Sequence, residues 1–346
     1  MDRTDRYFIG VDGGGTYTKA VAANQAGKIC ACAFGDTINF NAVSFDTAQK
    51  NLEELLDRLT QTLGNGHIEQ IFIGCSALDN AADDTLTHRL LGRYGSLDAG
   101  MNSDLYVALI GHVLDKSGVM IVSGTGSMGI ARSLSGEIYI CGGWGYAFGD
   151  EGSAFNIAVK GLRAATQYYD GRGEPTLLYE SMMDFFQLNE PRDLVPILYH
   201  PALDRKRAAG FSVCVSKCCE AGDDIACRIL EGAAADLASI AGVLIERVEQ
   251  FSSIAVYGGV LQNDRFVRES FTCRMQKRWP GIKIVDPEMP PEIGAVAAAM
   301  QRSGVKVTQD VLNNLRTYQQ KAFFTPFAGK SERTQDGCVL ARKDTL

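Results

Sequence analysis

The sequence predicts an α/β protein built from two similar lobes, and three observations support this. The 346 residues exceed the roughly 250–300 at which one hydrophobic core usually stops growing, so two domains are expected. Short apolar strands alternate with amphipathic helices along the chain. A strand, a glycine turn and a second strand occupy residues 7–23, and the pattern returns at residues 119–131. We therefore expect each lobe to open with the same hairpin.

The first hairpin turns on three consecutive glycines between two polar residues: Asp12, Gly13, Gly14, Gly15 and Thr16. A strand rather than a helix follows, which separates the segment from a dinucleotide-binding GxGxxG turn. Glycine has no Cβ, so backbone N–H groups can approach phosphate oxygens closely. Three glycines are costly unless a ligand approaches, so we interpret Asp12 as functional rather than as a turn cap. We expect Asp12 to be the only anionic group at this hairpin.

The second hairpin repeats the first, with Gly124, Thr125, Gly126 and Ser127 at its turn. Two such hairpins facing each other across a cleft would hold a polyphosphate from both sides. The hydroxyl groups of the threonines and the serine would add further hydrogen-bond donors.

Hydrophobic periodicity also predicts the elements between and beyond the hairpins. The expected helices are residues 44–63, 83–91, 104–114, 153–169, 223–248 and 265–277, with another opening at 290. The expected strands are residues 70–75, 254–257 and 282–285. We expect lobes at 1–117 and 118–324, followed by a loosely held tail at 325–346.

Composition limits the classes of partner. The formal net charge is −7, and no basic block stands out, so a nucleic-acid partner receives no support. The chain contains no apolar stretch of about 18 residues and no signal-peptide pattern at its start. We expect a cytoplasmic protein that does not bind a membrane.

Ten cysteines need an explanation in such a chain. Most lie in apolar segments, so we expect small buried side chains that stay reduced. The alternative is a zinc or iron–sulfur site built from Cys214, Cys218, Cys219 and Cys227. Such sites favour C-x₂-C pairs, and the sequence has none.

Three ordered glycine turns resemble the two phosphate loops and the adenosine loop of the actin-like superfamily. The third turn contains Gly258, Gly259 and Asn263. Residues 142–153 are similar to the GGWGxxxGDEGS segment of N-acetylglucosamine kinases and of the wider BadF/BadG/BcrA/BcrD ATPase family. The resemblance spans residues 7–300. It implies two actin-like (ribonuclease H-like) lobes around a nucleotide cleft, each with a mixed five-stranded-type sheet and flanking helices.

The resemblance implies ATP-dependent phosphorylation of a small sugar at its 6-hydroxyl. N-acetylglucosamine is the leading substrate, with glucosamine or an N-acetylmuramic acid type left open. Asp104 would be the catalytic base, and Asp12 would hold Mg²⁺ through water. The residues that would line the sugar are Asn39, Asp104, Gly143, Trp144, Gly145 and Asp150. Those that would contact ATP are Gly13, Gly14, Gly15, Thr16, Gly124, Thr125, Gly126, Ser127, Gly258, Gly259 and Asn263.

Several of these site assignments have a simpler structural alternative. Trp144 would otherwise belong to a packed core, Asn39 would be an ordinary loop residue, and Asp104 would be a helix cap. At the level of function, the alternatives are an ATP-driven activator of a radical dehydratase and a non-catalytic actin-like regulator. ROK sugar kinases are disfavoured because their cysteine-rich zinc motif is absent. Nucleotide preference and a homodimeric assembly are left open.

Overall fold

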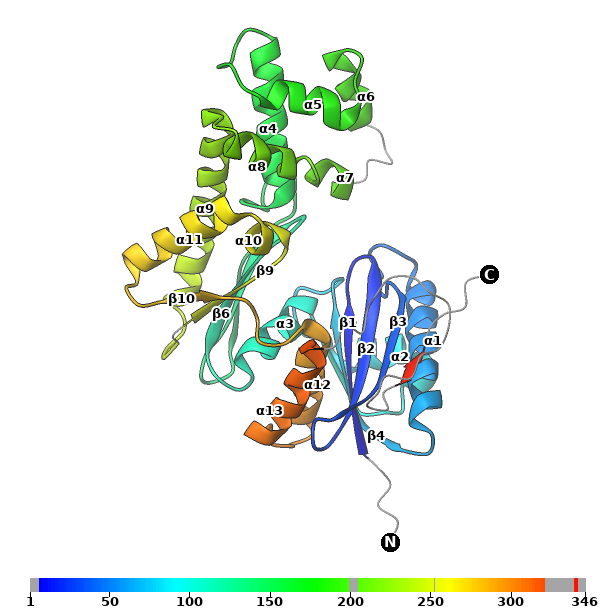
Figure 1. Ribbon diagram of the computed structural model, residues 1–346. Helices are drawn as coiled ribbons and strands as arrows, with labels where there is room; N and C mark the ends of the chain where they lie inside the picture. Colours follow the sequence, from blue (N-terminus) through cyan, green and yellow to red (C-terminus); the bar gives the residue numbers. More distant parts are fainter. Residues whose placement is uncertain (1–5, 199–204, 252, 321–338, 342–346) are drawn as a thin grey trace. The chain divides into compact units, whose positions relative to one another are not determined.

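The computed structural model describes residues 6–198, 205–251, 253–320 and 339–341 (Figure 1). The chain divides into two compact units: unit 1 comprises Met1–Asp115 and Pro287–Leu346, and unit 2 comprises Lys116–Asp286. Each unit contains one mixed sheet with flanking helices, so the expected fold class is confirmed.

The sheet of unit 1 has the strand order β11-β3-β2-β1-β4-β5. Its strands are β1 (Arg6–Gly13), β2 (Tyr17–Asn24), β3 (Ile29–Asp36), β4 (His67–Cys75), β5 (Ala99–Asn102) and β11 (Val339–Ala341). Strands β1 and β2 form an antiparallel pair, as the hairpin pattern predicted, and β3 pairs antiparallel with β2. Strand β4 runs parallel to β1, and β5 runs parallel to β4. Only β11 of the expected tail lies among the described residues, and it pairs with β3.

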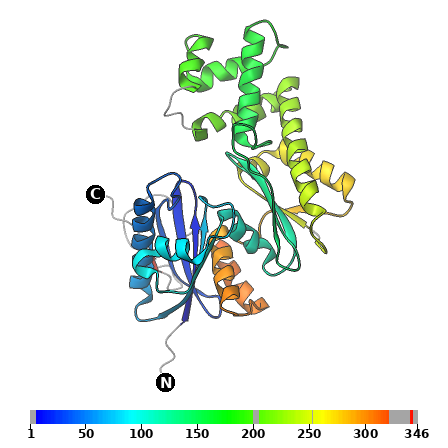
Figure 2. The same ribbon diagram turned by 180° about the vertical axis from the view of Figure 1, so that it is seen from behind.

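Helices cover both faces of this sheet (Figure 1 and, from behind, Figure 2). They are α1 (Phe45–Leu63), α2 (Asp84–Leu91), α3 (Asp104–Val113), α12 (Pro291–Arg302) and α13 (Gln309–Arg316), with short 3₁₀ turns η1 (Gly92–Tyr94) and η3 (Thr317–Gln320). Side chains alternate along β1, so Ile9 and Val11 pack in the core with α1 while Phe8 packs with α3 and α12. Unit 1 therefore has two apolar layers, one on each side of its sheet.

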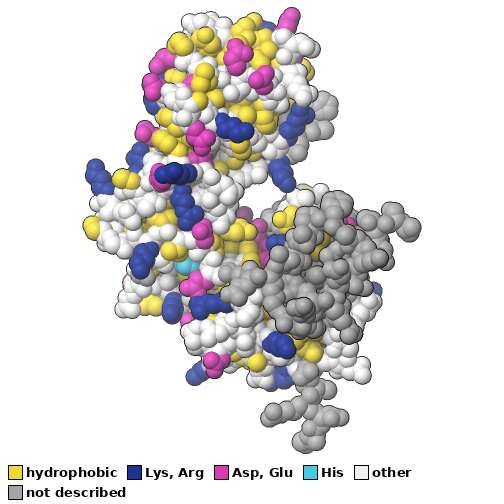
Figure 3. Space-filling model, in the orientation of Figure 1, with side chains coloured by type: hydrophobic (Ala, Val, Ile, Leu, Met, Phe, Trp, Pro, Cys, Tyr) yellow, Lys and Arg dark blue, Asp and Glu magenta, His cyan; other side chains and the backbone are white. Residues whose placement is uncertain are grey.

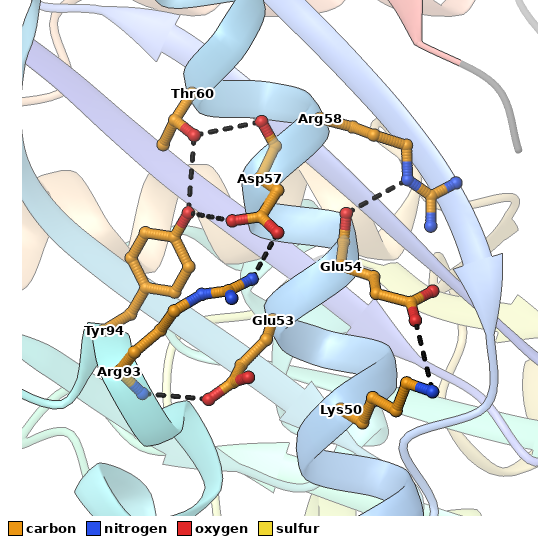
Figure 4. A network of polar contacts seen from close by, with 8 residues as sticks. All are labelled: Lys50, Glu53, Glu54, Asp57, Arg58, Thr60, Arg93 and Tyr94. Carbon is orange, nitrogen blue, oxygen red and sulfur yellow. Dashed lines mark hydrogen bonds and ion pairs between the residues drawn. The ribbon is translucent and has the colours of Figure 1, made fainter.

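The outer side of α1 is held by polar contacts to η1 (Figure 4). Asp57 accepts a hydrogen bond from Tyr94 at 2.7 Å and forms an ion pair with Arg93. Glu53 accepts a hydrogen bond from the backbone N–H of Arg93 at 2.9 Å. These carboxylates lie at the surface, and each has a donor as partner.

The second lobe is shorter than the sequence analysis expected. Residues 287–324 were assigned to it, but the chain returns to unit 1 at Pro287. A Cβ on Gly10 would lie 2.3 Å from the backbone nitrogen of Val296, so α12 packs directly on β1. The apolar side of α12 fills the layer that contains Phe8, and sequence periodicity alone could not show which sheet it covers.

Unit 2 has a five-stranded sheet in the order β10-β9-β6-β7-β8. The strands are β6 (Gly118–Ser123), β7 (Ser127–Arg132), β8 (Ile138–Gly142), β9 (Ser253–Tyr257) and β10 (Lys283–Val285). The helices are α4 (Ala154–Tyr169), α5 (Leu178–Phe186), α6 (Leu194–Leu198), α7 (Arg205–Ala209), α8 (Ser212–Glu220), α9 (Asp224–Ile245), α10 (Gly259–Asn263) and α11 (Arg265–Arg278), with the 3₁₀ turn η2 (Pro191–Asp193). The hairpin of β6 and β7 confirms the internal repeat. One buried cluster joins the sheet to α4, α8, α9 and α11.

The cysteines differ in one respect from the expectation that all stay reduced. Cys219 and Cys227 form a disulfide between the end of α8 and the first turn of α9. Among the described cysteines, Cys273 is exposed and the others are buried or half-buried. Within the described residues, no group of three or more His, Cys, Asp or Glu side chains is arranged to hold a metal ion.

The described surface is mixed in character. On the face drawn in Figure 3, Lys and Arg side chains are interspersed with Asp and Glu rather than gathered in one patch. None of the described helices has the length and apolar character needed to cross a membrane.

Candidate functional site

The strongest candidate site in unit 1 lies where three parallel strands end. Asp12 near the end of β1 is in register with Gly74 of β4, and Gly74 is in register with Asn102 of β5. Asp104 follows β5 by two residues and opens α3. In open α/β sheets, ligands bind outside the carboxyl ends of the strands. The fold therefore brings Asp12 and Asp104, which are far apart in sequence, to the carboxyl ends of neighbouring strands.

The first glycine turn is tightly packed at its base and exposed at its tip. A Cβ on Gly13 would lie 2.4 Å from Ile38, so that position accepts only glycine. The hydroxyl of Thr37 donates to the carbonyl oxygen of Gly14 at 2.7 Å. Gly15 and Thr16 are exposed, and a Cβ on Gly15 would meet nothing within 4 Å. The turn is therefore fixed in shape while its tip stays accessible to a ligand.

Asn39 is held in one orientation next to this turn. Its backbone N–H donates to the hydroxyl of Thr37 at 3.0 Å, and its side-chain amide donates to Ser76 at 3.0 Å. The backbone N–H of Ser76 in turn donates to the carbonyl of Gly13 at 2.8 Å. The side chain is thus anchored to the glycine turn, although its role in binding a sugar stays a prediction.

The interpretation of Asp104 as a helix cap is wrong. The N-cap of α3 is Ser103, whose hydroxyl accepts a hydrogen bond from the backbone N–H of Tyr106 at 3.2 Å. Asp104 is the first helical residue, and its carboxylate accepts a hydrogen bond from the backbone N–H of Leu105 at 2.9 Å. Burial raises the pKa of Asp104 above its ordinary value. The carboxylate is consequently a stronger base than an exposed aspartate.

Asp12 has an unusual electrostatic environment. Burial, followed by the negative charge of Glu292, raises the pKa of Asp12 to about 7, and Asp104 adds to the shift. Lys19 opposes the shift, and it is the register partner of Asp12 on β2. The expectation that Asp12 is the only anionic group at the hairpin is therefore wrong. Glu292 was missed because it belongs to α12, 280 positions away along the chain.

The second glycine turn is tied to the loop that follows β8. The backbone N–H of Ser127 donates to the carboxylate of Asp150 at 3.2 Å. A Cβ on Gly126 would lie 3.0 Å from that carboxylate. Asp150 itself has a φ of 56°, a left-handed conformation that is rare for a residue with a side chain. Burial raises the pKa of Asp150, and the Ser127 hydrogen bond opposes the shift.

Trp144 is not a core residue. Its side chain is 74% exposed, and Phe148 on the same loop is 78% exposed. Gly143 and Gly145 on either side have positive φ, and a Cβ on Gly149 would lie 2.8 Å from Trp144. The glycines thus shape a loop that presents large aromatic side chains to solvent, so the core-packing interpretation is wrong.

Unit 2 contains a cavity of about 580 Å³. Four residues that the sequence assigned to ATP line it: Gly124, Thr125, Gly259 and Asn263. Gly258 has a φ of 95°, and a Cβ there would lie 2.5 Å from the carbonyl of Ser123, so the third turn packs directly on the second. The structure thus brings the second and third glycine turns together at one cavity.

Sequence reasoning missed the opposite wall of this cavity. That wall comes from α7, α8 and the start of α11, and includes Lys206, Ser212, Val213, Ser216, Lys217 and Phe266. The hydroxyl of Ser216 donates to Asp264, the N-cap of α11, and fixes α8 against α11. No short motif marks these residues. Gly126, Ser127, Gly143, Trp144, Gly145 and Asp150 are not among the residues that line the cavity.

Comparisons with known proteins agree with this architecture. The family model of the BadF/BadG/BcrA/BcrD ATPase family matches residues 9–299. The chain is 30% identical over 302 residues to an N-acetylmuramic acid/N-acetylglucosamine kinase of Clostridium acetobutylicum, covering 85% of this chain and 98% of that protein. It is 26% identical over 312 residues to an N-acetyl-D-glucosamine kinase of Dictyostelium discoideum, covering 85% and 97%.

A solved structure supports the fold. It is that of a candidate N-acetylglucosamine kinase from Chromobacterium violaceum, with a TM-score of 0.66 and 23% identity, covering 85% of this chain and 98% of that one. Because the family model spans most of the sequence and the fold agrees, this chain belongs to the BadF/BadG/BcrA/BcrD ATPase family.

Proposed function

We propose that this protein transfers the γ-phosphate of ATP to the 6-hydroxyl of an amino sugar, with N-acetylglucosamine as the leading substrate. The observation that carries the proposal is the pair of partly buried carboxylates, Asp12 and Asp104, at one edge of the unit 1 sheet. Phosphoryl transfer needs a carboxylate to orient the attacking hydroxyl and another to hold the metal. The relatives named above are sugar kinases, which supports this substrate class.

The nucleotide is assigned to the cavity of unit 2. Gly124 and Thr125 would contact phosphate oxygens, and Gly259 and Asn263 would border the adenosine. The volume of about 580 Å³ is in the range of small-molecule sites. In unit 1, the exposed tip of the first hairpin, Gly15 and Thr16, would contact phosphate as well.

Mg²⁺ is assigned to Asp12, and the residues present fit that ion. Mg²⁺ prefers oxygen ligands and keeps several waters, so one carboxylate suffices as a direct or water-mediated partner. One oxygen of Glu292 is buried without a hydrogen-bond partner, which leaves negative charge beneath Asp12. When bound, the ion would offset the charge of the phosphate oxygens.

Asp104 is proposed as the general base. Its carboxylate would accept a hydrogen bond from the sugar hydroxyl, orient it for attack and take its proton as the phosphorus–oxygen bond forms. A pKa raised by burial strengthens Asp104 as a base.

The residues that the family resemblance assigns to the sugar are Asn39, Asp104, Gly143, Trp144, Gly145 and Asp150. A buried amide or carboxylate that loses its hydroxyl partner costs free energy, so such groups discriminate well between sugar isomers. The exposed ring of Trp144 offers an apolar surface for the C–H face of a sugar or for an N-acetyl methyl group. The alternatives of a dehydratase activator and of a non-catalytic regulator receive no support from the curated relatives named above.

The test is ADP release with a panel of N-acetylglucosamine, glucosamine, N-acetylmuramic acid and glucose. We expect the highest kcat/KM for one of the amino sugars. The matched control is 6-deoxy-N-acetylglucosamine, which should bind but release no ADP. ADP release at the sugar-free rate with every compound would contradict the proposal.

A further inference from the structure

Glu292 is a buried carboxylate to which the proposed reaction assigns no role. It lies in the first turn of α12 and is 2% exposed. One oxygen lies 3.7 Å from the ammonium of Lys19 and accepts a hydrogen bond from the hydroxyl of Tyr318 at 3.3 Å. The other oxygen is fully buried and has no hydrogen-bond partner within the described residues. A buried, unpartnered carboxylate oxygen costs free energy and therefore calls for an explanation.

The position of Glu292 is set by α12 packing on β1. A Cβ on Gly10 would lie 2.4 Å from the carbonyl oxygen of Glu292. Gly10 and Asp12 are two residues apart on β1, so they face the same side of the sheet. Lys19 is the register partner of Asp12 on β2, and its side chain lies on that side as well. Glu292 is thus on the same side as Asp12, with Lys19 beside both.

Around Asp12, carboxylates outnumber cationic side chains. Lys19 is the cation among the groups that act on Asp12, whereas Glu292 and Asp104 are carboxylates like Asp12 itself. One lysine therefore faces three carboxylates in the described part of unit 1. A divalent cation with its hydration shell would supply the missing positive charge.

We propose that Glu292 is a positioning residue for the divalent cation of Mg·ATP. Its carboxylate holds Lys19 next to Asp12, and its negative charge draws the hydrated cation toward Asp12 without touching it. The inference rests on the proposed function and adds a residue to the site from an element that returns to unit 1 at the end of the chain.

A purely structural role makes a different prediction. If Glu292 only anchored α12 through Tyr318, its loss would loosen the site and weaken nucleotide binding equally with and without metal. If its charge attracts the cation, its loss should reduce the benefit of Mg²⁺ and leave metal-free ATP bound equally well or better. The changes in nucleotide affinity with and without Mg²⁺ therefore distinguish an electrostatic role of Glu292 from a structural one.

The experiment compares Glu292→Gln with the parent protein, using calorimetry with a non-hydrolysable ATP analogue. Glutamine keeps the size of the side chain and can still accept the hydrogen bond from Tyr318. The quantity of interest is the ratio of the dissociation constant in EDTA to that in excess Mg²⁺. We expect this ratio to fall about tenfold in Glu292→Gln, as loss of one charge near a divalent ion suggests.

Two controls isolate the charge of Glu292. Glu288→Gln makes the same chemical change four residues earlier, at an exposed carboxylate that pairs with Arg316, and should leave the ratio unchanged. Tyr318→Phe removes the hydrogen bond to Glu292 without changing a charge, and should also leave the ratio unchanged. If Glu292→Gln folds poorly, Lys19→Gln tests the same ion pair, and loss of the positive charge should raise the ratio.

The outcomes are distinct. A ratio for Glu292→Gln within about twofold of the parent would overturn the inference and leave the proposed function intact. An unchanged ratio with binding weakened equally in EDTA and in Mg²⁺ would assign Glu292 a structural role and overturn the inference as well. Failure of the parent protein to bind the analogue at all would contradict the proposed function itself.

Discussion

Two groups of carboxylates in unit 1 are partnered very differently. On the outer side of α1, Asp57 has both a tyrosine hydroxyl and an arginine as partners, and it lies at the surface. On the side covered by α12, Glu292 and Asp12 are more deeply buried and share Lys19. Surface carboxylates are solvated whether or not they are paired, whereas buried unpaired carboxylates destabilise the fold. The second group thus indicates a place where the missing partner is a ligand.

The largest effect is expected for Asp104→Asn. Asparagine keeps the size and the hydrogen bond to the N–H of Leu105 but cannot take a proton, so kcat should fall about 10²–10⁴-fold. Sugar affinity and thermal midpoint should change little, because Ser103 rather than Asp104 caps the helix.

The matched control for that variant is Asp84→Asn, because Asp84 also occupies the first helical position after an N-cap residue, in α2. Its turnover should equal that of the parent. Turnover of Asp104→Asn within a few-fold of the parent would remove Asp104 as the base and direct attention to Asp150.

The pH dependence of stability should reveal the free-energy cost of ionising the buried carboxyl group of Asp12. Its pKa is raised from 3.8 to about 7 in the folded protein, so the folded state holds this proton more tightly than the unfolded state does. Stability contributed by this group should therefore fall between about pH 4 and pH 7 and then level off, by at most about 4 kcal/mol. The free energy of unfolding should be measured in EDTA across this range. Asp12→Asn should flatten the decline and be the more stable protein at pH 8; an equal decline in both proteins would contradict the assignment.

The free energy of unfolding should depend far less on the surface carboxylate of Asp57. Asp57→Asn removes an exposed ion pair with Arg93, and such pairs contribute about 0–1 kcal/mol. The free energy of unfolding should fall by no more than about 1 kcal/mol, with unchanged turnover and an unchanged pH profile. A larger loss would show that the network in Figure 4 stabilises unit 1 more than the comparison implies.

The smallest signal is expected from Trp144. The protein has two tryptophans, so a Trp279→Phe variant reports on Trp144 alone. Saturating sugar should shift its emission to shorter wavelength, since binding would remove water from a ring that is 74% exposed. No change in emission with sugar would place Trp144 outside the site.

The sequence correctly predicted the elements that depend on interactions between residues close together in the chain. The two glycine hairpins, the strands beside them and helices such as α1 and α11 follow from turn chemistry and hydrophobic period, and the structure confirms them. The family resemblance supplied the sites, since no spacing rule brings Asp12 to Asp104. The failures concern long-range packing. Neither the return of α12 to unit 1 nor the charge of Glu292 beside Asp12 could be inferred from local pattern.

The unit 2 cavity shows the same limit. Its glycine-turn side was predicted, because glycines between strands carry a recognisable pattern. Its α8 side was not, because Ser212, Val213 and Ser216 lie on a helix whose sequence drew attention only for its cysteines. A binding wall made from ordinary helical residues leaves no motif in the sequence.

The most direct test of the account measures the stoichiometry of the reaction. The intact protein is incubated with Mg·ATP and N-acetylglucosamine, and ADP and phosphorylated sugar are quantified together by mass spectrometry, with Asp104→Asn in parallel. We expect equal molar amounts of ADP and sugar 6-phosphate from the intact protein, and a matching loss of both in the variant. ADP and inorganic phosphate without phosphorylated sugar would show an ATPase that does not transfer to this substrate, and would contradict the account.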